Sequence, residues 1–174
     1  MNHHFMNGQE ADRRKMKVLV VDDEPLNVEL LSEMLAEAGY TRVKTVLDSR
    51  HALATCDQFA PDIVLLDWMM PHVSGREILE ALCSTAAEVF LPVVVLTADS
   101  NEETKRAALQ AGASDFLLKP LDVLEVSLRI ANLLETRRVH LQLDLQCAAY
   151  EEALRACALE LRVAQAELAT AQLR

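Results

Sequence analysis

Polar side chains follow four apolar runs of this sequence, at the points where those runs end. They are Asp22 and Asp23 after KVLVV, Asp67 after DIVLL, Thr97 after PVVVL, and Lys119 at the end of DFLLK. If the runs are parallel strands, their carboxyl ends meet at one edge of a sheet, which is where ligands bind in open α/β folds. We therefore expect three carboxylates, one hydroxyl and one ammonium to lie close together.

Three neighbouring carboxylates require a positive partner. At an effective dielectric constant of about 20, two like charges about 4 Å apart repel each other by about 4 kcal/mol. A set of oxygen ligands without His or Cys favours Mg²⁺ over zinc. Beside a metal ion, a carboxylate such as Asp67 can accept a phosphoryl group, with Lys119 neutralising its charge and Thr97 binding one of its oxygens.

Helix capping is the alternative explanation for each aspartate taken alone. Carboxylates that follow strands often cap the next helix, and this would account for Asp22, Asp23 or Asp67 singly. Capping is a weaker explanation for five polar residues at the ends of four strands.

Five β-rich runs alternate with helix-like segments. The runs cover residues 17–21, 42–46, 62–66, 92–96 and 115–119. The first, third and fourth runs are apolar almost without alternation, which is typical of strands buried on both faces of a parallel sheet. This order of elements predicts an α/β fold with a doubly wound, five-stranded parallel sheet and right-handed crossovers.

Turn and capping residues predict where two of the intervening helices begin and end. Pro25 stands at a first-turn position, and Gly39 follows the apolar stripe of the same helix. Ser100 and Glu103 have the spacing of a capping box for a later helix, which Gly112 closes.

Charge and glycine content argue against two common functions. The chain has 17 Lys and Arg against 27 Asp and Glu, a formal net charge of −10, and its one basic cluster is RRK at residues 13–15. Direct binding of nucleic acid is therefore disfavoured. The four glycines form neither a GxGxxG motif nor a P-loop, so a nucleotide held by a glycine-rich loop is not supported.

The cysteines and the apolar runs indicate a cytoplasmic protein. The four cysteines form no CxxC pair and have no His at ligand spacing, so we expect reduced thiols and no structural metal. The apolar runs are shorter than the roughly 20 residues needed to cross a membrane. The N-terminus has no apolar region typical of a signal peptide.

Four sequence motifs resemble those of a known family. VLVVDDEP, IVLLDWMMPHVSG, VVVLTA and DFLLKP resemble the receiver domain of two-component response regulators. The resemblance implies a receiver domain over residues 16–137 with the flavodoxin-like strand order 2-1-3-4-5. We expect the segment before it, residues 1–15, to be disordered.

The resemblance also implies roles for individual residues. Asp67 resembles the phosphoacceptor, and Lys119 resembles the cation that pairs with the phosphate. Asp23 and Asp67 resemble direct Mg²⁺ ligands, and Asp22 resembles a residue that positions the metal through water. The backbone carbonyl of Met69 resembles a further ligand of the metal.

Thr97 and Phe116 resemble the switch pair of this family. In that switch the threonine moves toward the phosphoryl group and the aromatic ring turns inward. Family members often have Tyr at the second position, and a plain core aromatic is the alternative role for Phe116. The resemblance further predicts a cis peptide bond between Lys119 and Pro120.

Residues 138–174, called the tail below, continue a helical pattern, because no Pro or Gly follows Pro120. Apolar or small residues recur in the tail at alternating spacings of four and three, forming a seam of Leu143, Cys147, Tyr150, Leu154, Cys157, Leu161, Ala164, Leu168 and Ala171. This heptad seam predicts a coiled coil that joins two copies of the chain.

The tail also carries a second apolar stripe on another face. Its residues are Leu145, Ala149, Ala156, Leu159, Val163 and Ala166. The second stripe leaves antiparallel or four-helix packing open. Packing of the tail against its own domain is a further alternative.

Together these features favour a cytoplasmic phosphorylation switch that is not itself an enzyme. A histidine kinase or phosphotransfer protein would deliver a phosphoryl group to Asp67 with Mg²⁺, and the tail would pass on the change. Alternatively, the chain is the regulatory N-terminal part of a longer cyclic-di-GMP phosphodiesterase, diguanylate cyclase or histidine kinase. A Mg²⁺-dependent hydrolase with an Asp nucleophile is disfavoured, because such phosphatases need a second acid where Met69 stands.

Overall fold

The computed structural model describes residues 15–85 and 90–172. The segment predicted to be disordered, residues 1–15, lies outside the described residues except for Lys15. Five side chains of the two predicted tail stripes also lie outside the description, namely Val163, Ala164, Ala166, Leu168 and Ala171.

Five parallel strands form one sheet in the order β2-β1-β3-β4-β5. The strands are β1 (Lys17–Val21), β2 (Arg42–Val46), β3 (Ile63–Asp67), β4 (Val93–Thr97) and β5 (Asp115–Leu118). The predicted fold class and strand order are therefore confirmed. Strand β4 begins one residue later than predicted, since Pro92 has no amide hydrogen to donate to the ladder.

Helices follow each strand. They are α2 (Pro25–Glu37), α3 (Ala52–Phe59), α4 (Gly75–Thr85), α5 (Glu102–Gln110) and α6 (Val123–Gln172), with a short 3₁₀ helix η1 (Ser49–His51) before α3. Pro25 begins α2 as predicted. The predicted capping box at Ser100 is wrong. Asn101 is the cap instead, and its side chain accepts a hydrogen bond from the amide of Glu103 at 3.1 Å, a role that Asn fills as well as Ser.

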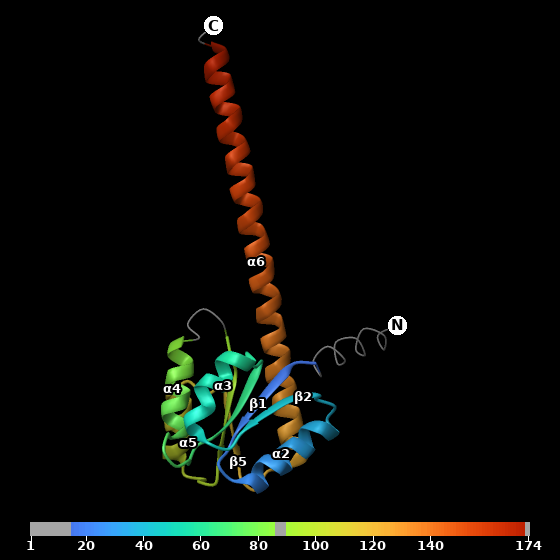
Figure 1. The fold of residues 1–174 in the computed structure, drawn as a ribbon, viewed down its shortest axis with the longest axis vertical. Helices are drawn as coiled ribbons and strands as arrows, with labels where there is room; N and C mark the ends of the chain where they lie inside the picture. Colours follow the sequence, from blue (N-terminus) through green and yellow to red (C-terminus); the bar gives the residue numbers. More distant parts are fainter. Residues whose placement is uncertain (1–14, 86–89, 173–174) are drawn as a thin grey trace. The chain divides into compact units, whose positions relative to one another are not determined.

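Both faces of the sheet are covered by helices (Figure 1). One face packs against α3, α4 and α5 through buried side chains such as Ala52, Ile78 and Ala108. The other face lies against α2 and the first part of α6, which bury Leu31 and Ile130. Strands β3 and β4 are buried along their whole length, as expected for central strands of a parallel sheet. The sheet is therefore a rigid mount for residues at its carboxyl edge.

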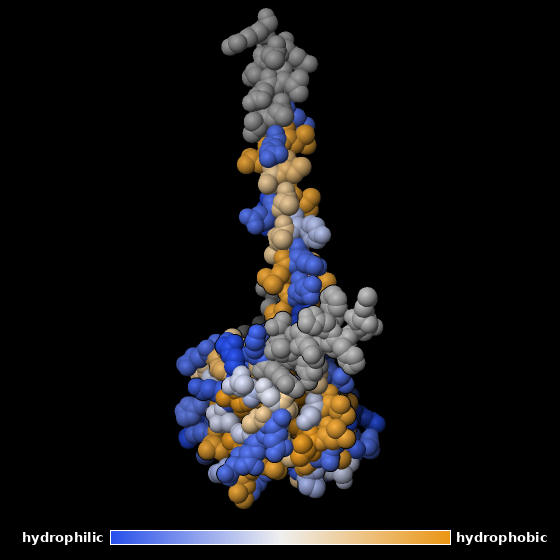
Figure 2. Space-filling view, turned by 90° about the vertical axis from the view of Figure 1, so that its right-hand side faces the viewer, coloured by the Kyte–Doolittle hydropathy of each residue, from blue (hydrophilic) through white to orange (hydrophobic). Residues whose placement is uncertain are grey.

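Helix α6 belongs to two compact units of the chain, one ending at Arg138 and one running from Val139 onward. In the first unit, α6 buries Val126, Ile130 and Leu134 in the core. In the second unit, several large apolar side chains are exposed along the described helix, with hydrophilic ones between them (Figure 2). Across residues 15–85 and 90–172, no helix combines the length and hydrophobicity required to cross a membrane.

Candidate functional site

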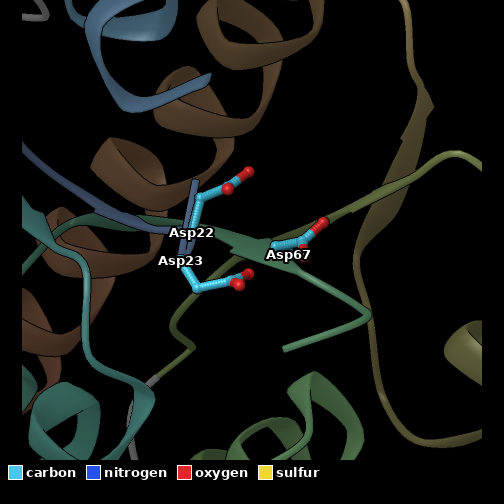
Figure 3. A group of neighbouring side chains, drawn as sticks. All are labelled: Asp22, Asp23 and Asp67. Atoms are coloured by element: carbon cyan, nitrogen blue, oxygen red, sulfur yellow. The ribbon is translucent and has the colours of Figure 1, made fainter. Parts of the chain in front are cut away.

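Three carboxylates meet at the carboxyl edge of the sheet. Asp22 and Asp23 directly follow β1, and Asp67 is the last residue of the neighbouring strand β3. One carboxylate oxygen from each lies within 4.8 Å of the others, and Figure 3 shows the three side chains extending toward the same region. Asp22 is 0% exposed and Asp67 is 5% exposed, whereas Asp23 is the most accessible of the three. These three residues are called the acidic cluster below.

The ammonium group of Lys119 bridges two members of the acidic cluster. Its Nζ donates to Asp22 Oδ2 at 2.8 Å and to Asp67 Oδ1 at 2.7 Å. The backbone holds Lys119 in place, because its amide donates to the carbonyl of Thr97 at 2.8 Å. The bond between Lys119 and Pro120 is cis, as predicted. The structure therefore brings together four of the predicted site residues.

The start of α2 supplies further hydrogen bonds to Asp22. The amide of Glu24 donates to Asp22 Oδ1 at 2.9 Å, and the side-chain amide of Asn27 donates to both carboxylate oxygens at 3.1 Å. Together with Lys119, these donors satisfy a carboxylate that would be costly to bury alone. Asp22 is thus held in one orientation, while Asp67 keeps an oxygen open to the cleft.

The environment shifts the pKa values of two residues in the site. Burial raises the pKa of Asp67, which the ammonium of Lys119 counteracts and the charges of Asp22 and Asp23 reinforce. Burial alone would lower the pKa of Lys119, but its hydrogen bonds to Asp22 and Asp67 outweigh burial and raise it. Lys119 therefore stays charged, and the acidic cluster remains short of positive charge.

The donor set of the acidic cluster fits a divalent cation. With all three carboxylates ionised, one ammonium leaves two negative charges uncompensated in a largely buried site. All the side-chain donors are carboxylate oxygens, the ligands that Mg²⁺ prefers over softer N and S donors. The cluster lines a cleft of about 750 Å³, which leaves room for water and a phosphoryl group.

The loop after β3 completes the rim of this cleft. Trp68 and Met69 both line it, and the side chain of Met69 is largely exposed. The loop turns sharply at Gly75, whose amide donates to the carbonyl of Trp68 at 3.2 Å. A Cβ atom at position 75 would lie 2.2 Å from the backbone oxygen of Asp67, so only glycine allows this approach.

The two predicted switch residues lie outside the cleft lining. Thr97 is buried, and its hydroxyl accepts a hydrogen bond from the amide of Asp99 at 3.1 Å. Phe116 on β5 lines a separate cavity beside α5, where the ammonium of Lys105 lies 5.4 Å from its ring centroid. The ring is partly exposed and also packs against the hydrophobic core, so the switch role and the core role both stay predictions.

Several residues near the cleft were not expected from the sequence. Asn27 bonds Asp22, and Thr104 on α5 bonds Asp99 at 2.6 Å at the rim. No sequence pattern distinguishes these polar residues from others in the first turns of exposed helices. Their partners become evident only once the loops are placed.

Comparisons with known proteins agree with this geometry. The family described as response regulator receiver domain matches residues 18–131. The chain is 40% identical over 124 residues to the probable transcriptional regulatory protein TcrX of Mycobacterium tuberculosis, covering 71% of this chain and 52% of that protein. It is 33% identical over 138 residues to a probable cyclic di-GMP phosphodiesterase of Vibrio cholerae, covering 79% of this chain and 31% of the relative.

A solved structure with a similar fold is the chemotaxis protein CheY4 of Vibrio cholerae. It superposes with a TM-score of 0.61 at 32% identity, covering 67% of this chain and 98% of CheY4. The chain thus matches nearly all of CheY4 but only about half or less of the two longer relatives.

Proposed function

This chain belongs to the family of response regulator receiver domains, and we propose that it accepts a phosphoryl group on Asp67 from a histidine kinase or a phosphotransfer protein, with Mg²⁺. The observation that carries this proposal is the acidic cluster with Lys119 bridging Asp22 and Asp67. Asp23, Asp67 and the backbone carbonyl of Met69 would hold the metal directly, and Asp22 would act through water.

Asp67 is the nucleophile in the proposed reaction. Lys119 occupies its Oδ1, and no other described residue donates a hydrogen bond to its Oδ2, so Oδ2 attacks the phosphorus. A new P–O bond forms as the P–N bond to the donor histidine breaks, and the electron pair of that bond stays on the imidazole nitrogen. When bound, Mg²⁺ would neutralise charge on the transferring oxygens.

Lys119 and Thr97 act on the phosphoryl group after transfer. The Lys119 ammonium is already beside Asp67 and pairs with one phosphoryl oxygen. The Thr97 hydroxyl accepts a hydrogen bond from the backbone amide of Asp99, and after transfer it donates to a second phosphoryl oxygen. Movement of Thr97 then favours an inward turn of Phe116, away from Lys105.

The tail is the proposed output element. Exposed apolar side chains of the seam, such as Leu154 and Leu161, support its pairing with a second copy of the chain. We assign residues 16–137 to the receiver domain and the tail to dimerisation and signal transmission. A parallel arrangement would bring the two copies of the exposed residue Cys157 together.

A second function is favoured by the length of one relative. The chain covers 31% of the probable cyclic di-GMP phosphodiesterase of Vibrio cholerae, so it could serve as the regulatory part of a longer enzyme joined through α6. The receiver domain itself is a phosphoacceptor in either case.

All four cysteines are free thiols, which supports a cytoplasmic location.

Phosphorylation of the intact chain by acetyl phosphate and MgCl₂ tests the proposal. Intact mass spectrometry should show the gain of one phosphoryl group, and this gain should disappear when Mg²⁺ is chelated. Asp67→Asn should abolish it, because the nucleophilic oxygen is gone. Asp57→Asn, which alters an exposed aspartate on α3, is the control and should gain the group normally.

Two results would contradict the proposal. One is a wild-type protein that gains no phosphoryl group from acetyl phosphate or from any histidine kinase supplied with ATP. The other is an undiminished gain in Asp67→Asn, which would place the modification on another residue.

A further inference from the structure

Ser49 is a buried polar residue that is not part of the acidic cluster. It is the first residue of η1 and is only 3% exposed. It does not line the cleft around the acidic cluster. A hydroxyl buried to this degree needs hydrogen-bond partners, and those partners show what the residue holds in place.

Both partners of Ser49 belong to the loop that carries Met69. The hydroxyl Oγ donates to the carbonyl of Pro71 at 2.6 Å and accepts from the amide of Val73 at 3.2 Å. These contacts join positions 22 and 24 residues apart in the sequence. Ser49 therefore links the start of η1 to residues 68–74, called the acceptor loop below.

The two partners of Ser49 are also the two ends of a tight turn. The amide of Val73 donates to the carbonyl of Pro71 at 2.9 Å, and His72 between them has φ of 70°. A three-residue turn with positive φ at its centre is the rare and strained form of the γ-turn. A non-glycine residue keeps such a conformation only where its surroundings hold it.

Other contacts fix the base of the acceptor loop. Gly75 donates its amide to the carbonyl of Trp68 and lies close against the backbone of Asp67. Met69 lies between this base and the turn held by Ser49. Two fixed points therefore determine the course of the backbone that includes the Met69 carbonyl.

We propose that Ser49 is a positioning residue for phosphoryl acceptance, because its hydroxyl holds the strained turn at 71–73 and thereby shapes the acceptor loop for metal binding. This inference rests on the proposed function. Ser49 touches neither substrate nor metal and acts through the backbone of Pro71 and Val73. Loss of the hydroxyl releases the turn and lowers the affinity of the site for Mg²⁺.

The Ser49→Ala variant of the full chain tests this role. Titration with MgCl₂ alone, followed by the fluorescence of the single tryptophan Trp68, should show a dissociation constant about tenfold above that of the wild type, within the range seen when supports of metal ligands are removed. Hydrogen exchange without Mg²⁺ should show faster exchange of the Val73 amide.

Ser114→Ala is the matched control. Its hydroxyl also bonds a backbone amide, that of Val93 at 3.3 Å, but at the start of β4 and away from the acceptor loop. The Mg²⁺ affinity of this variant should equal that of the wild type.

Substitutions at His72 separate the turn from the general stability of the chain. His72→Gly in the Ser49→Ala background should recover Mg²⁺ affinity, because glycine adopts positive φ without strain. His72→Pro should lower the affinity with Ser49 intact, because proline fixes φ near −65°. His72 is exposed, so neither change removes core packing.

The outcomes distinguish this inference from the proposed function. A folded Ser49→Ala protein with Mg²⁺ affinity within about twofold of the wild type overturns the positioning role but leaves phosphoryl acceptance intact. If Ser49→Ala does not fold, an unchanged Mg²⁺ affinity of the His72→Pro variant would also overturn the positioning role of Ser49. A wild-type protein that neither binds Mg²⁺ nor accepts phosphoryl groups overturns both.

Discussion

Asp67 is held in an environment that favours its charged form only in part. Burial and two neighbouring carboxylates raise its pKa, and the ammonium of Lys119 opposes them. The same features that prepare the site for a cation make it unfavourable without one. The acidic cluster therefore lowers the stability of the metal-free protein, and the same carboxylates provide the site for metal and phosphoryl groups.

Replacing Asp67 by Asn should stabilise the metal-free protein. A neutral side chain of the same shape removes the cost of burying the charge and its repulsion from Asp22 and Asp23, but it also loses the attraction to Lys119. Because the pKa of Asp67 is raised, the unfavourable contributions are the larger, and we expect a net gain on the order of 1 kcal/mol. Urea unfolding in EDTA, followed by Trp68 fluorescence, measures the gain. Asp57→Asn should give no gain, and a lower stability of Asp67→Asn would contradict this account of the site.

The gain should depend on pH in a defined direction. Because the folded-state pKa of Asp67 lies above its ordinary value of 3.8, the folded protein binds this proton more tightly than the unfolded chain does. Wild-type stability from this group is present below pH 3.8 and is lost as the pH rises through the folded-state pKa. The advantage of Asp67→Asn should thus widen with rising pH and then level off.

Some residues of the site could be predicted from the sequence and others could not. Asp22, Asp67 and Lys119 end apolar runs, and strand geometry alone brings such residues to one edge. Ser49 acts through contacts more than 20 residues away, which local patterns do not encode. The sequence placed Thr97 at a strand end, but it did not show that the Thr97 hydroxyl accepts a hydrogen bond from the amide of Asp99.

At the scale of elements, the central strands were the most predictable parts. Strands buried on both faces are continuously apolar, so β1, β3 and β4 stand out in the sequence. The start of α5 was less predictable, because Ser and Asn are equally good N-cap residues. Ser100 and Asn101 are neighbours, and the structure shows that Asn101 is the cap.

Helix α6 offers a test of which residues stabilise the receiver domain. Leu134→Ala should lower the free energy of unfolding by about 3 kcal/mol, because this side chain is 0% exposed and its loss leaves a cavity. Leu128→Ala, the same change on the same helix at a site 55% exposed, should cost less than about 0.5 kcal/mol. Urea unfolding of both variants measures the difference, and equal losses would contradict the burial described for α6.

At the scale of the molecule, the tail is the part whose proposed role depends on a second chain. Large apolar side chains on a single exposed helix favour a partner, and the seam and the second stripe offer two faces for it. Sequence periodicity identifies both faces. It does not select between them, because both faces carry exposed leucines.

Paired substitutions on the two faces should identify the one that is used. Leu154→Asp with Leu161→Asp should convert a dimer into a monomer in sedimentation equilibrium, because two buried charges would face each other across the seam. Leu145→Asp with Leu159→Asp adds the same charge on the second stripe and should leave the dimer intact. The reverse result would assign the interface to the second stripe, and a monomeric wild type would refute dimerisation.

The position of β1 in the sheet also bears on how the chain is made. This strand is synthesised first, yet its two neighbours are β2 and β3, both later in the chain. One backbone edge of β1 therefore stays unpaired in the nascent polypeptide until β3, which ends at Asp67, has left the ribosome. Such a segment is prone to aggregation during that interval, so we expect chaperones that bind short apolar stretches to bind residues 17–21 of the nascent chain.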